Sequence, residues 1–577
     1  METSKRSPIA ALLVLTTFAA QGCHDSNNSG PMNSVSQDIK AAAGGSVSYP
    51  GNAVVVTIPA GALNTDTAVT IAKISTPTPN LTGTLSANGD VYSVQFSNGA
   101  VLSQPMVLKM TAPTVPQHPR LGEIAELQGG AWVRLSANFF RSSDTAVIGL
   151  TKDTTSFRVV DRTLQAMTGA SVARGQDIFL HETFGNEAFF GDVIKLHDLL
   201  NNLKPVDAVG VGVQIDLTQV PQSIVAVLTG NDLAAKQSAL QDPAVTRALI
   251  KAGAVVGVKG VYNDPSSDMM SAAGITCALC HVRVAPTAFI LSADGSTTML
   301  PVGPLQLDGA PNTAMDAGKI LSLTATVQSL GLSSGLAGWG PGNFDVRALP
   351  DNPLDDGVNN PTQTPPLWNF VDLELQDYPY DWDGLFFSGT KPNNALASQA
   401  EAVYDLVMHA DGAFGIPNVG NLAPVLRVSP PQSLVDALVA AEQAAPGNVI
   451  DTQKLLDVQD FERSIVSPAP GQYDEALAET GFMLFNEPKK GNCASCHSTP
   501  EFTGPVITQI TATMLGGGLA GGIKTPGLRG IGSTAPYFHD ASAVTLKDAV
   551  KTYVDRGITP PLTDDEQSAI AEYLKSL

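Results

Sequence analysis

Basic residues and long hydrophobic runs are both scarce in this chain. Of its 577 residues only 33 are Lys or Arg, against 54 Asp or Glu, and the net charge is −21. This deficit argues against nucleic acid as a partner, and it suits either electrostatic docking to a basic protein or simple solubility. Beyond the first 20 residues, no apolar run is long enough to cross a membrane. The sequence therefore predicts a mature chain that is soluble apart from any N-terminal anchor.

Cysteine is also rare, and four of its five copies fall in two copies of one motif. The motif is Cys-x-x-Cys-His, in the segments Cys277-Ala-Leu-Cys280-His281 and Cys493-Ala-Ser-Cys496-His497. A thioredoxin-like pair, a zinc site or a short disulfide would explain the cysteines, but none needs a histidine directly after both pairs. In c-type attachment two thiols add to the haem vinyl groups and the histidine becomes the proximal iron ligand. The sequence therefore predicts two covalent haems and redox chemistry.

The fifth cysteine, Cys23, bears on the compartment. Lys5 and Arg6 precede the apolar run 9–20, which is too short to span a bilayer but has the form of a signal-peptide core. Gly22-Cys23 follows, where bacterial lipoproteins are cleaved and acylated. We expect a signal peptide at 1–22, a lipid-anchored tether at 23–43, and a location in the periplasm or at the outer membrane and cell surface.

Pattern changes along the chain predict three domains, a number that fits its length. Residues 44–161 contain alternating segments such as 53–58 and 91–96 between turn residues, which predicts a β-sandwich. Residues 162–468 and 469–577 have helical periodicity and one Cys-x-x-Cys-His motif each. The expected fold is multidomain: an N-terminal all-β sandwich followed by two mainly α, cytochrome c-type haem domains, the first enlarged.

Within the first haem domain, helices are expected around 173–179, 189–197, 395–408 and 452–465. His197 then falls on or beside an apolar face. It is either an ordinary core histidine or a distal haem ligand.

The second haem domain has clearer helix signals. A helix is expected at 475–485, ahead of the motif, and Thr545–Asp548 and Thr563–Glu566 are capping boxes that each open a helix. In the last helix four apolar residues share one face, which we expect to pack against Phe482 and Phe485; they are Ile570, Tyr573, Leu574 and Leu577.

Two regions resemble known families. Segments 57–63 and 67–71 resemble the sandwich module of ankyrin-type and netrin-receptor-type proteins, which implies a spacer or adhesion module. Residues 165–577 resemble the di-haem cytochrome c peroxidases, the related di-haem enzyme that matures methylamine dehydrogenase, and a group of large di-haem cytochromes. The matching segments are 184–189, 339–342, 461–468, 491–497, 525–529, 535–540, 545–553 and 562–567; they include Arg529 and His539.

This second resemblance implies roles for particular residues. The family's tryptophan between the haems lies in a Trp-Asp-Gly segment, which makes Trp382 the candidate electron relay. Tyr553 stands where the peroxidases have a methionine as sixth ligand of the second haem. A tyrosine there resembles the methylamine-dehydrogenase-maturation branch, whereas the alternative is that Tyr553 only packs and Met514 or His539 is the ligand.

One departure from the family bears on catalysis. The peroxidases carry a glutamate beside a methionine near the first haem, and the corresponding segment here has Val407 in its place. His409 or Asp405 would then have to substitute, with His409 also a candidate iron ligand, or peroxide chemistry does not occur. Ca²⁺ is a further candidate cofactor.

Three functions remain open on the sequence. The first is a redox enzyme of the di-haem peroxidase superfamily, with a basic redox protein as partner. The second is a pure electron-transfer cytochrome without catalysis, and the third is a di-haem oxygenase resembling the rubber oxygenases. The sequence leaves the substrate and the oligomeric state undetermined.

Overall fold

The computed structural model describes most of the chain, with gaps. The described residues are 33–116, 121–291, 297–329, 331, 333–345, 361–376, 378, 382, 452–504, 507–508 and 523–577. The predicted signal peptide, Cys23, the expected helix at 395–408, His409 and Met514 lie outside them. In the described part of the chain, no helix is both long enough and apolar enough to cross a membrane.

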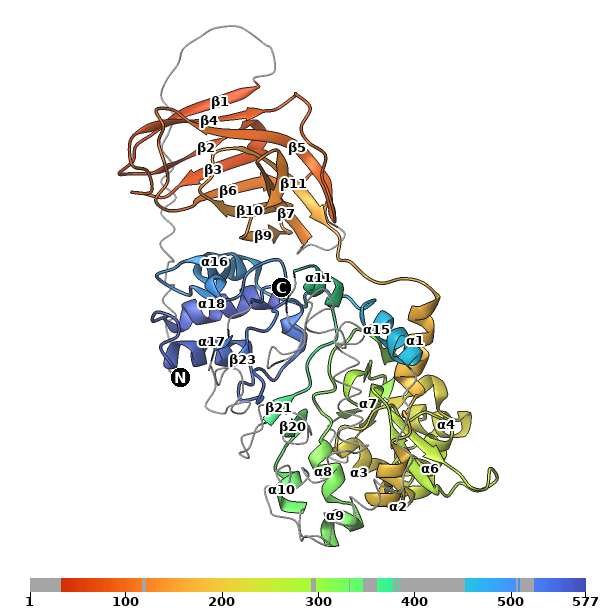
Figure 1. The fold of residues 1–577 in the computed structure, drawn as a ribbon. Helices are drawn as coiled ribbons and strands as arrows, with labels where there is room; N and C mark the ends of the chain where they lie inside the picture. Colours follow the sequence, from red (N-terminus) through yellow and green to blue (C-terminus); the bar gives the residue numbers. More distant parts are fainter. Residues whose placement is uncertain are drawn as a thin grey trace.

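Two antiparallel sheets form the N-terminal sandwich, as predicted (Figure 1). One has the strand order β1-β4-β5-β11-β7-β8 and the other β2-β3-β6-β10-β9. Along β3 alternate residues are buried, and their side chains enter the core between the sheets, so the period-2 pattern of the sequence is the pattern of burial. The strands are β1 Ser34–Ile39, β2 Gly45–Ser48, β3 Val54–Ile58, β4 Thr67–Lys73, β5 Leu85–Phe96, β6 Met106–Thr111, β7 Gly122–Gln128, β8 Ala131–Arg134, β9 Asn138–Arg141, β10 Ala146–Thr151 and β11 Ser156–Arg162.

The sandwich begins earlier than its sequence pattern suggests. Strand β1 lies inside the stretch 23–43 expected to be a tether, and it pairs with β4 in the register Ser34↔Ala72 to Ile39↔Thr67. As an edge strand with only Ile39 fully buried, it needs little apolar sequence. The polar composition of this stretch therefore led to the wrong prediction of a tether where β1 lies.

Short elements make up the first haem domain. Helical segments alternate with two-stranded pairs, and the segment expected to be helical at 189–197 is divided by Lys195, whose backbone is left-handed, between a π-helical turn and α2. The helices are α1 Ala170–His181, α2 Leu196–Asn202, α3 Pro205–Gly210, α4 Gln222–Thr229, α5 Leu233–Gln241, α6 Pro243–Lys251, α7 Ala278–His281, α8 Ala317–Ser322, α9 Ala325–Ser329, α10 Ser333–Ala337, α11 Phe370–Leu375 and α15 Thr452–Glu462. The paired strands are β12 Ile215–Asp216 with β18 Val302–Gly303, β13 Val258–Val261 with β14 Ala272–Ile275, β15 Arg283–Val284 with β19 Leu305–Gln306, β16 Ala288–Leu291 with β17 Thr297–Leu300, and β20 Asn343–Asp345 with β21 Pro361–Gln363.

The second haem domain follows its sequence signals closely. It contains α16 Glu475–Asn486, α17 Leu546–Asp555 and α18 Asp564–Lys575, with the short pair β22 Ile507–Thr508 and β23 Ile523–Lys524. Both predicted capping boxes are present, since each threonine and its partner acid exchange hydrogen bonds with the other's backbone N–H. The apolar face of α18 packs in one core with Phe482 and Phe485 of α16, as expected.

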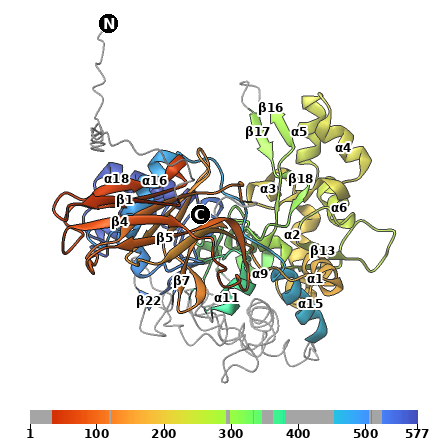
Figure 2. The same ribbon diagram turned by 90° about the horizontal axis from the view of Figure 1, so that it is seen from above.

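The sandwich and the second haem domain share this core. Phe139 of β9 stacks on Phe482 with 5.8 Å between ring centroids and meets Tyr573 edge-on at 6.2 Å. Above this contact, Arg141 pairs with Glu479 of α16 at 2.6 Å. In Figure 1 the β9 side of the sandwich lies against α16, and in both ribbon views the first haem domain lies to one side (Figures 1 and 2). The sandwich is thus packed onto a haem domain, which a detached spacer would not be.

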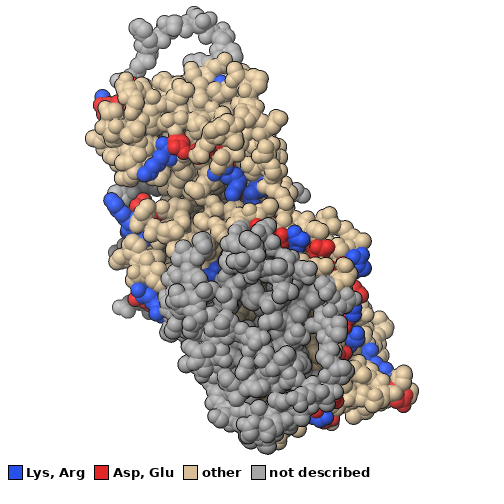
Figure 3. Space-filling view, viewed as in Figure 1, with Lys and Arg blue, Asp and Glu red and all other residues tan. Residues whose placement is uncertain are grey.

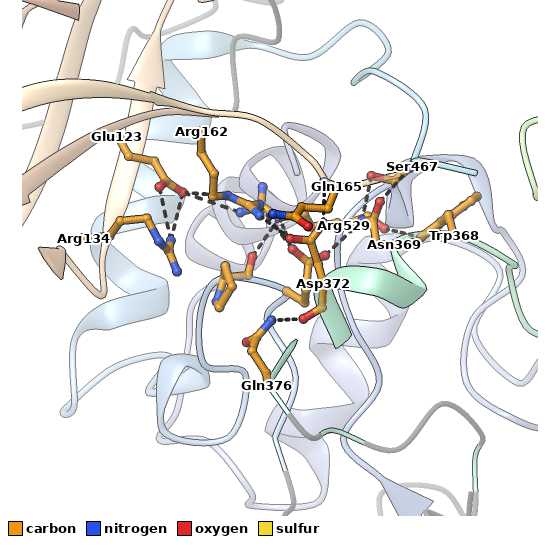
Figure 4. A network of polar contacts seen from close by, with 12 residues as sticks. Glu123, Arg134, Arg162, Gln165, Trp368, Asn369, Asp372, Gln376, Ser467 and Arg529 are labelled. Atoms are coloured by element: carbon orange, nitrogen blue, oxygen red, sulfur yellow. Dashed lines mark hydrogen bonds and ion pairs between the residues drawn. The ribbon is translucent and has the colours of Figure 1, made fainter. Parts of the chain in front are cut away.

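A buried ion network joins all three domains (Figure 4). Arg162, at the end of the sandwich, donates to Asp372 of α11 and to Glu501 of the second haem domain, both at 3.2 Å. Glu501 also lies 3.3 Å from the Nε of Arg529. The network contains three carboxylates and three guanidinium groups; they belong to Glu123, Asp372, Glu501, Arg134, Arg162 and Arg529.

The carboxylates of this network compete for the same positive charge. Burial, and secondly the neighbouring Glu501, raise the pKa of Asp372 to about 6. A buried charge is tolerated only when paired, so loss of one arginine here would leave an acid uncompensated. The network therefore fixes how the three domains dock.

The shared core gives the first prediction. Phe139→Ala removes a buried ring between the sandwich and α16, and we expect it to cost about 3–5 kcal/mol of unfolding free energy, the usual range for a buried Phe. Because the core is continuous, the sandwich and the second haem domain should unfold together in the wild type. Calorimetry would show one transition, and circular dichroism of the β-structure and absorbance of the haem would change at the same temperature. Val133→Ala, at an exposed position of β8, is the control. Two separate transitions in the wild type would contradict the shared core.

Candidate haem sites

The second Cys-x-x-Cys-His motif folds as a short helical turn. After Asn492, which has a left-handed backbone, the N–H of His497 donates to the carbonyl of Cys493 at 2.9 Å. The buried His497 ring donates from Nδ1 to the carbonyl of Phe502 at 2.8 Å, so Nε2 keeps its lone pair. Burial lowers the pKa of His497 to about 4. The imidazole is therefore neutral at pH 7, which is the form that binds iron.

This motif lies on the wall of a large apolar cavity. The cavity holds about 1290 Å³, including its mouth, and Cys493, Cys496 and His497 line it together with mainly aliphatic and aromatic side chains. The two sulfur atoms are free thiols in the structure; in a c-type protein they stand in the position of the thioether sulfurs. Burial raises the pKa of the Cys493 thiol to about 12. An apolar cavity beside two thiols and a neutral imidazole fits a covalently bound porphyrin.

Tyr553 reaches the same cavity from α17. Its ring lies 6.0 Å from that of Phe538, and burial, followed by the neighbouring Cys493 and Cys496, raises the pKa of its phenol. The structure thus places Tyr553 with His497 in one cavity. His539 is not itself among the lining residues, although its neighbour Phe538 is; it is almost fully buried, and burial lowers its pKa to about 4.

The first motif occupies helix α7 in the other domain. Cys277 is buried, and the side chain of Thr276 just before it donates to the carbonyl of Leu180 in α1 at 3.0 Å. Burial raises the pKa of the Cys277 thiol, and the buried Glu462 of α15 adds to the effect. The motif is therefore held between α1 and α15.

The two motifs sit in matching helix frames. In each, a helix with a Gly-x-x-x-Phe sequence crosses a later helix at the glycine: Gly175 of α1 at Asp457 of α15, and Gly481 of α16 at Ala569 of α18. A Cβ would lie 1.7 Å from the Asp457 carbonyl oxygen in the first crossing and 2.0 Å from that of Ala569 in the second. Only glycine permits helices this close.

The phenylalanine of each Gly-x-x-x-Phe sequence then faces the proximal histidine. Phe179 lies 6.5 Å from His281, and Phe485 lies 6.5 Å from His497, measured between ring centroids. Each phenylalanine also meets an aromatic ring of the crossing helix, Phe461 at 5.1 Å and Tyr573 at 5.2 Å. The two histidines therefore have the same aromatic neighbour at the same distance, although His497 is buried and His281 only partly so.

A further repeated segment follows each motif. It reads Thr-Pro-x-Leu-x and ends before a residue with left-handed backbone, Asn369 in the first domain and Gly530 in the second. The N–H of Asn369 donates to the carbonyl of Ile465 at 3.0 Å, and that of Gly530 donates to Leu577 at 3.1 Å. Both acceptors stand four residues after the aromatic ring of the crossing helix. The repeated Gly-x-x-x-Phe and Thr-Pro-x-Leu-x patterns are the sequence signal that marks this repeat.

Other predicted residues lie at varying distances from these frames. Trp382 lines the second cavity; its indole N–H donates to the carbonyl of Gln363 at 2.9 Å, and its ring is 6.4 Å from His539. Arg529 also lines the cavity and lies over the Phe502 ring at 5.2 Å. His197 sits on α2, between leucines of a separate apolar cluster, with its Nε2 3.5 Å from Asp198. Its role as a distal ligand stays a prediction.

Ca²⁺ stays a prediction from the sequence. Among the residues that the structure describes, no three His, Cys, Asp or Glu side chains gather in a group that could hold a metal ion.

Comparison with known proteins supports the same chemistry for the C-terminal region. Residues 478–577 match the cytochrome c family. A segment is 31% identical over 137 residues to the methylamine utilization protein MauG of Methylophilus methylotrophus, covering 20% of this chain and 41% of that protein. Another match is 30% identical over 142 residues to the cytochrome c551 peroxidase of Nitrosomonas europaea, covering 21% and 42%.

The chain is thus similar, in part, to MauG and to a cytochrome c peroxidase, and it spans less than half the length of either curated relative. A solved structure of a MauG-like protein associated with microbial copper homeostasis is 20% identical, with a TM-score of 0.18 over 22% of this chain and 57% of that one.

The glycine crossings give the second prediction. Gly175→Val and Gly481→Val each force two helices apart, so we expect each to lower the melting temperature and to impair haem attachment in its own domain only. Haem staining of proteolytic fragments, together with thermal unfolding, would measure both effects. Gly210→Ala is the control, because a Cβ at Gly210 would meet no atom within 4 Å. Wild-type stability and attachment in both valine variants would show that the crossings are not needed.

Proposed function

We propose that this protein is an exported di-haem c-type cytochrome that acts as a redox enzyme of the di-haem peroxidase and MauG superfamily. The observation that carries the proposal is the second cavity, where Cys493, Cys496 and His497 share an apolar space with Tyr553. The repeated helix frame around His281 supports a second haem in the first domain.

The residues present suit the implied haems. Cys277 and Cys280 would attach one porphyrin and Cys493 and Cys496 the other, with His281 and His497 as proximal ligands. The haems would supply one-electron redox chemistry at iron. The chain's own contribution is orientation: the hydrogen bond from His497 to Phe502 fixes its tautomer and ring plane, and Phe485 packs against that ring.

A tyrosine ligand favours an enzyme over a simple carrier. A phenolate is anionic and stabilises ferric iron, which lowers the haem potential and makes higher oxidation states easier to reach. Because burial disfavours the phenolate, the phenol would give its proton to a base only where a cation such as iron could bind and stabilise the anionic oxygen. Trp382, on the same wall, is proposed as an electron relay by its resemblance to the family tryptophan.

Val407 stands where the peroxidases have a glutamate that assists cleavage of the peroxide bond. The absence of this acid favours oxidation of another substrate over reduction of peroxide. Val407 and His409 lie outside the described residues, so the first domain's reactive side is argued from sequence. The alternatives are a pure electron carrier and an oxygenase resembling the rubber oxygenases, and both keep the two haems.

Export and membrane attachment are part of the proposal. The lipoprotein-like segment at Cys23 would anchor the chain at the periplasmic or outer surface, and covalent haem belongs in that compartment. A basic redox protein remains the proposed partner, on net charge alone. On the face drawn in Figure 3, acidic and basic side chains of the described residues lie interspersed, and these residues form no single acidic patch there.

Haem counting tests the proposal. Cys277→Ala and Cys493→Ala should each leave one covalent haem per chain, because each pair of thiols captures its own porphyrin, and haem staining with pyridine haemochrome absorbance would count them. Carbon monoxide binding to the reduced protein then separates an enzyme with an open iron site from a carrier, and hydrogen peroxide turnover against oxygen uptake separates the two enzymes. Two haems in either alanine variant would refute the di-haem assignment.

The ligand assignment of Tyr553 gives a further prediction. Tyr553→Met should raise the potential of the second haem and introduce a near-infrared sulfur-to-iron band, because methionine is neutral where the phenolate is anionic. Tyr553→Phe should instead open the site to carbon monoxide. Tyr49→Phe, in the sandwich, where the ring of Tyr49 meets that of Tyr92 edge-on at 5.0 Å, is the matched control. Spectra and potential unaltered by both Tyr553 substitutions would assign Tyr553 to packing alone.

A further inference from the structure

Trp368 occupies the seam between the two haem domains. It belongs to the apolar cluster that contains Cys277, Val282 and Phe179 of the first domain. The same indole lines the second cavity, together with Cys493 and His497. One buried aromatic ring, 6% exposed, is therefore part of the surroundings of both attachment motifs.

Contacts on the second domain hold this ring in place. The indole N–H of Trp368 donates to the carbonyl of Arg529 at 3.1 Å. The ring lies on Gly530, where a Cβ would come within 2.8 Å of ring atom Cζ2. Glycine at this position thus lets the indole approach the second domain's backbone directly.

The repeat explains why these residues meet. Trp368 and Arg529 hold the same place in the two Thr-Pro-x-Leu-x segments, and Asn369 and Gly530 follow them. Equivalent positions from the two repeats therefore contact each other across the seam.

We propose that Trp368 is an electron-transfer link between the two haems, in addition to the relay assigned to Trp382. The proposal rests on the di-haem assignment. In the step, one electron leaves a reduced haem and reduces the other, oxidised haem, while Trp368 is unchanged overall and no proton moves. A π-system that bridges a protein gap gives stronger electronic coupling than saturated side chains, and the hydrogen bond to the Arg529 carbonyl continues the bonded route into the second domain.

The test measures electron exchange between the haems in the intact protein. The half-reduced protein is bound to carbon monoxide, the ligand is released by a light flash, and the redistribution of the electron is followed by haem absorbance. Trp368→Leu should slow this exchange by at least an order of magnitude, Trp368→Phe by less, and Trp368→Tyr least. Trp382→Phe, measured beside them, reports the other relay independently.

Haem content and the ferric and ferrous spectra of each variant are recorded first, so that loss of a haem is distinguished from loss of coupling. If two haems are present and exchange in Trp368→Leu stays at the wild-type rate, the link through Trp368 is overturned. If leucine, phenylalanine and tyrosine slow exchange equally, the ring acts only by spacing the domains, and the proposal is again overturned. A wild-type count of one haem would instead refute the proposed function.

Discussion

The two glycine-mediated helix crossings are the constraint on which the rest of the haem-domain structure depends. At Gly175 and Gly481 a helix comes so near its partner that any side chain would strike a backbone carbonyl. This approach sets where the phenylalanine four residues later points, and both phenylalanines reach a proximal histidine at the same distance. The partner helices begin or end far away in sequence, so each motif is enclosed only when the domain is complete.

Much of the fold could be predicted from the sequence, and the features that could not be predicted have physical causes. Capping boxes at Thr545 and Thr563 and the period-2 pattern of β3 are local, since a hydrogen bond or a buried face acts within a few residues. The edge strand at Ser34–Ile39 was missed because backbone pairing to β4 needs almost no apolar side chain. Tyr553 was proposed as a ligand because it stands where the peroxidases have a methionine; it lines the second cavity, and its ligand role stays a prediction. His197 depended on packing between short helices, which a sequence does not specify.

The position of the sandwich could not have been foreseen from its own strands. Its contact with the second haem domain depends on Phe139, one apolar residue in a four-residue strand, and on Arg162, the last residue of β11. Burying Arg162 is favourable only where Asp372 and Glu501 arrive from two other domains. Glu501 is also next to Phe502, whose carbonyl accepts the hydrogen bond of His497. The junction thus connects docking of the sandwich to the segment that supports His497, the proposed proximal ligand.

The two repeats differ in the length of chain before the motif and in the residue that each places at the seam. Cys493 follows Phe485 by 8 positions, while Cys277 follows Phe179 by 98, and the additional chain forms α2 to α6 and the β13–β14 pair. At the seam the second repeat has Arg529 where the first has Trp368. The arginine turns its guanidinium into the buried ion network and gives only its carbonyl to the seam, whereas the tryptophan gives its ring. A pair of arginines would have placed two buried charges together, and a pair of tryptophans would have left Glu501 with one partner fewer. The difference between Arg529 and Trp368 therefore serves two purposes at one pair of equivalent positions. The arginine completes the buried ion network, and the tryptophan makes an apolar contact between the haem domains.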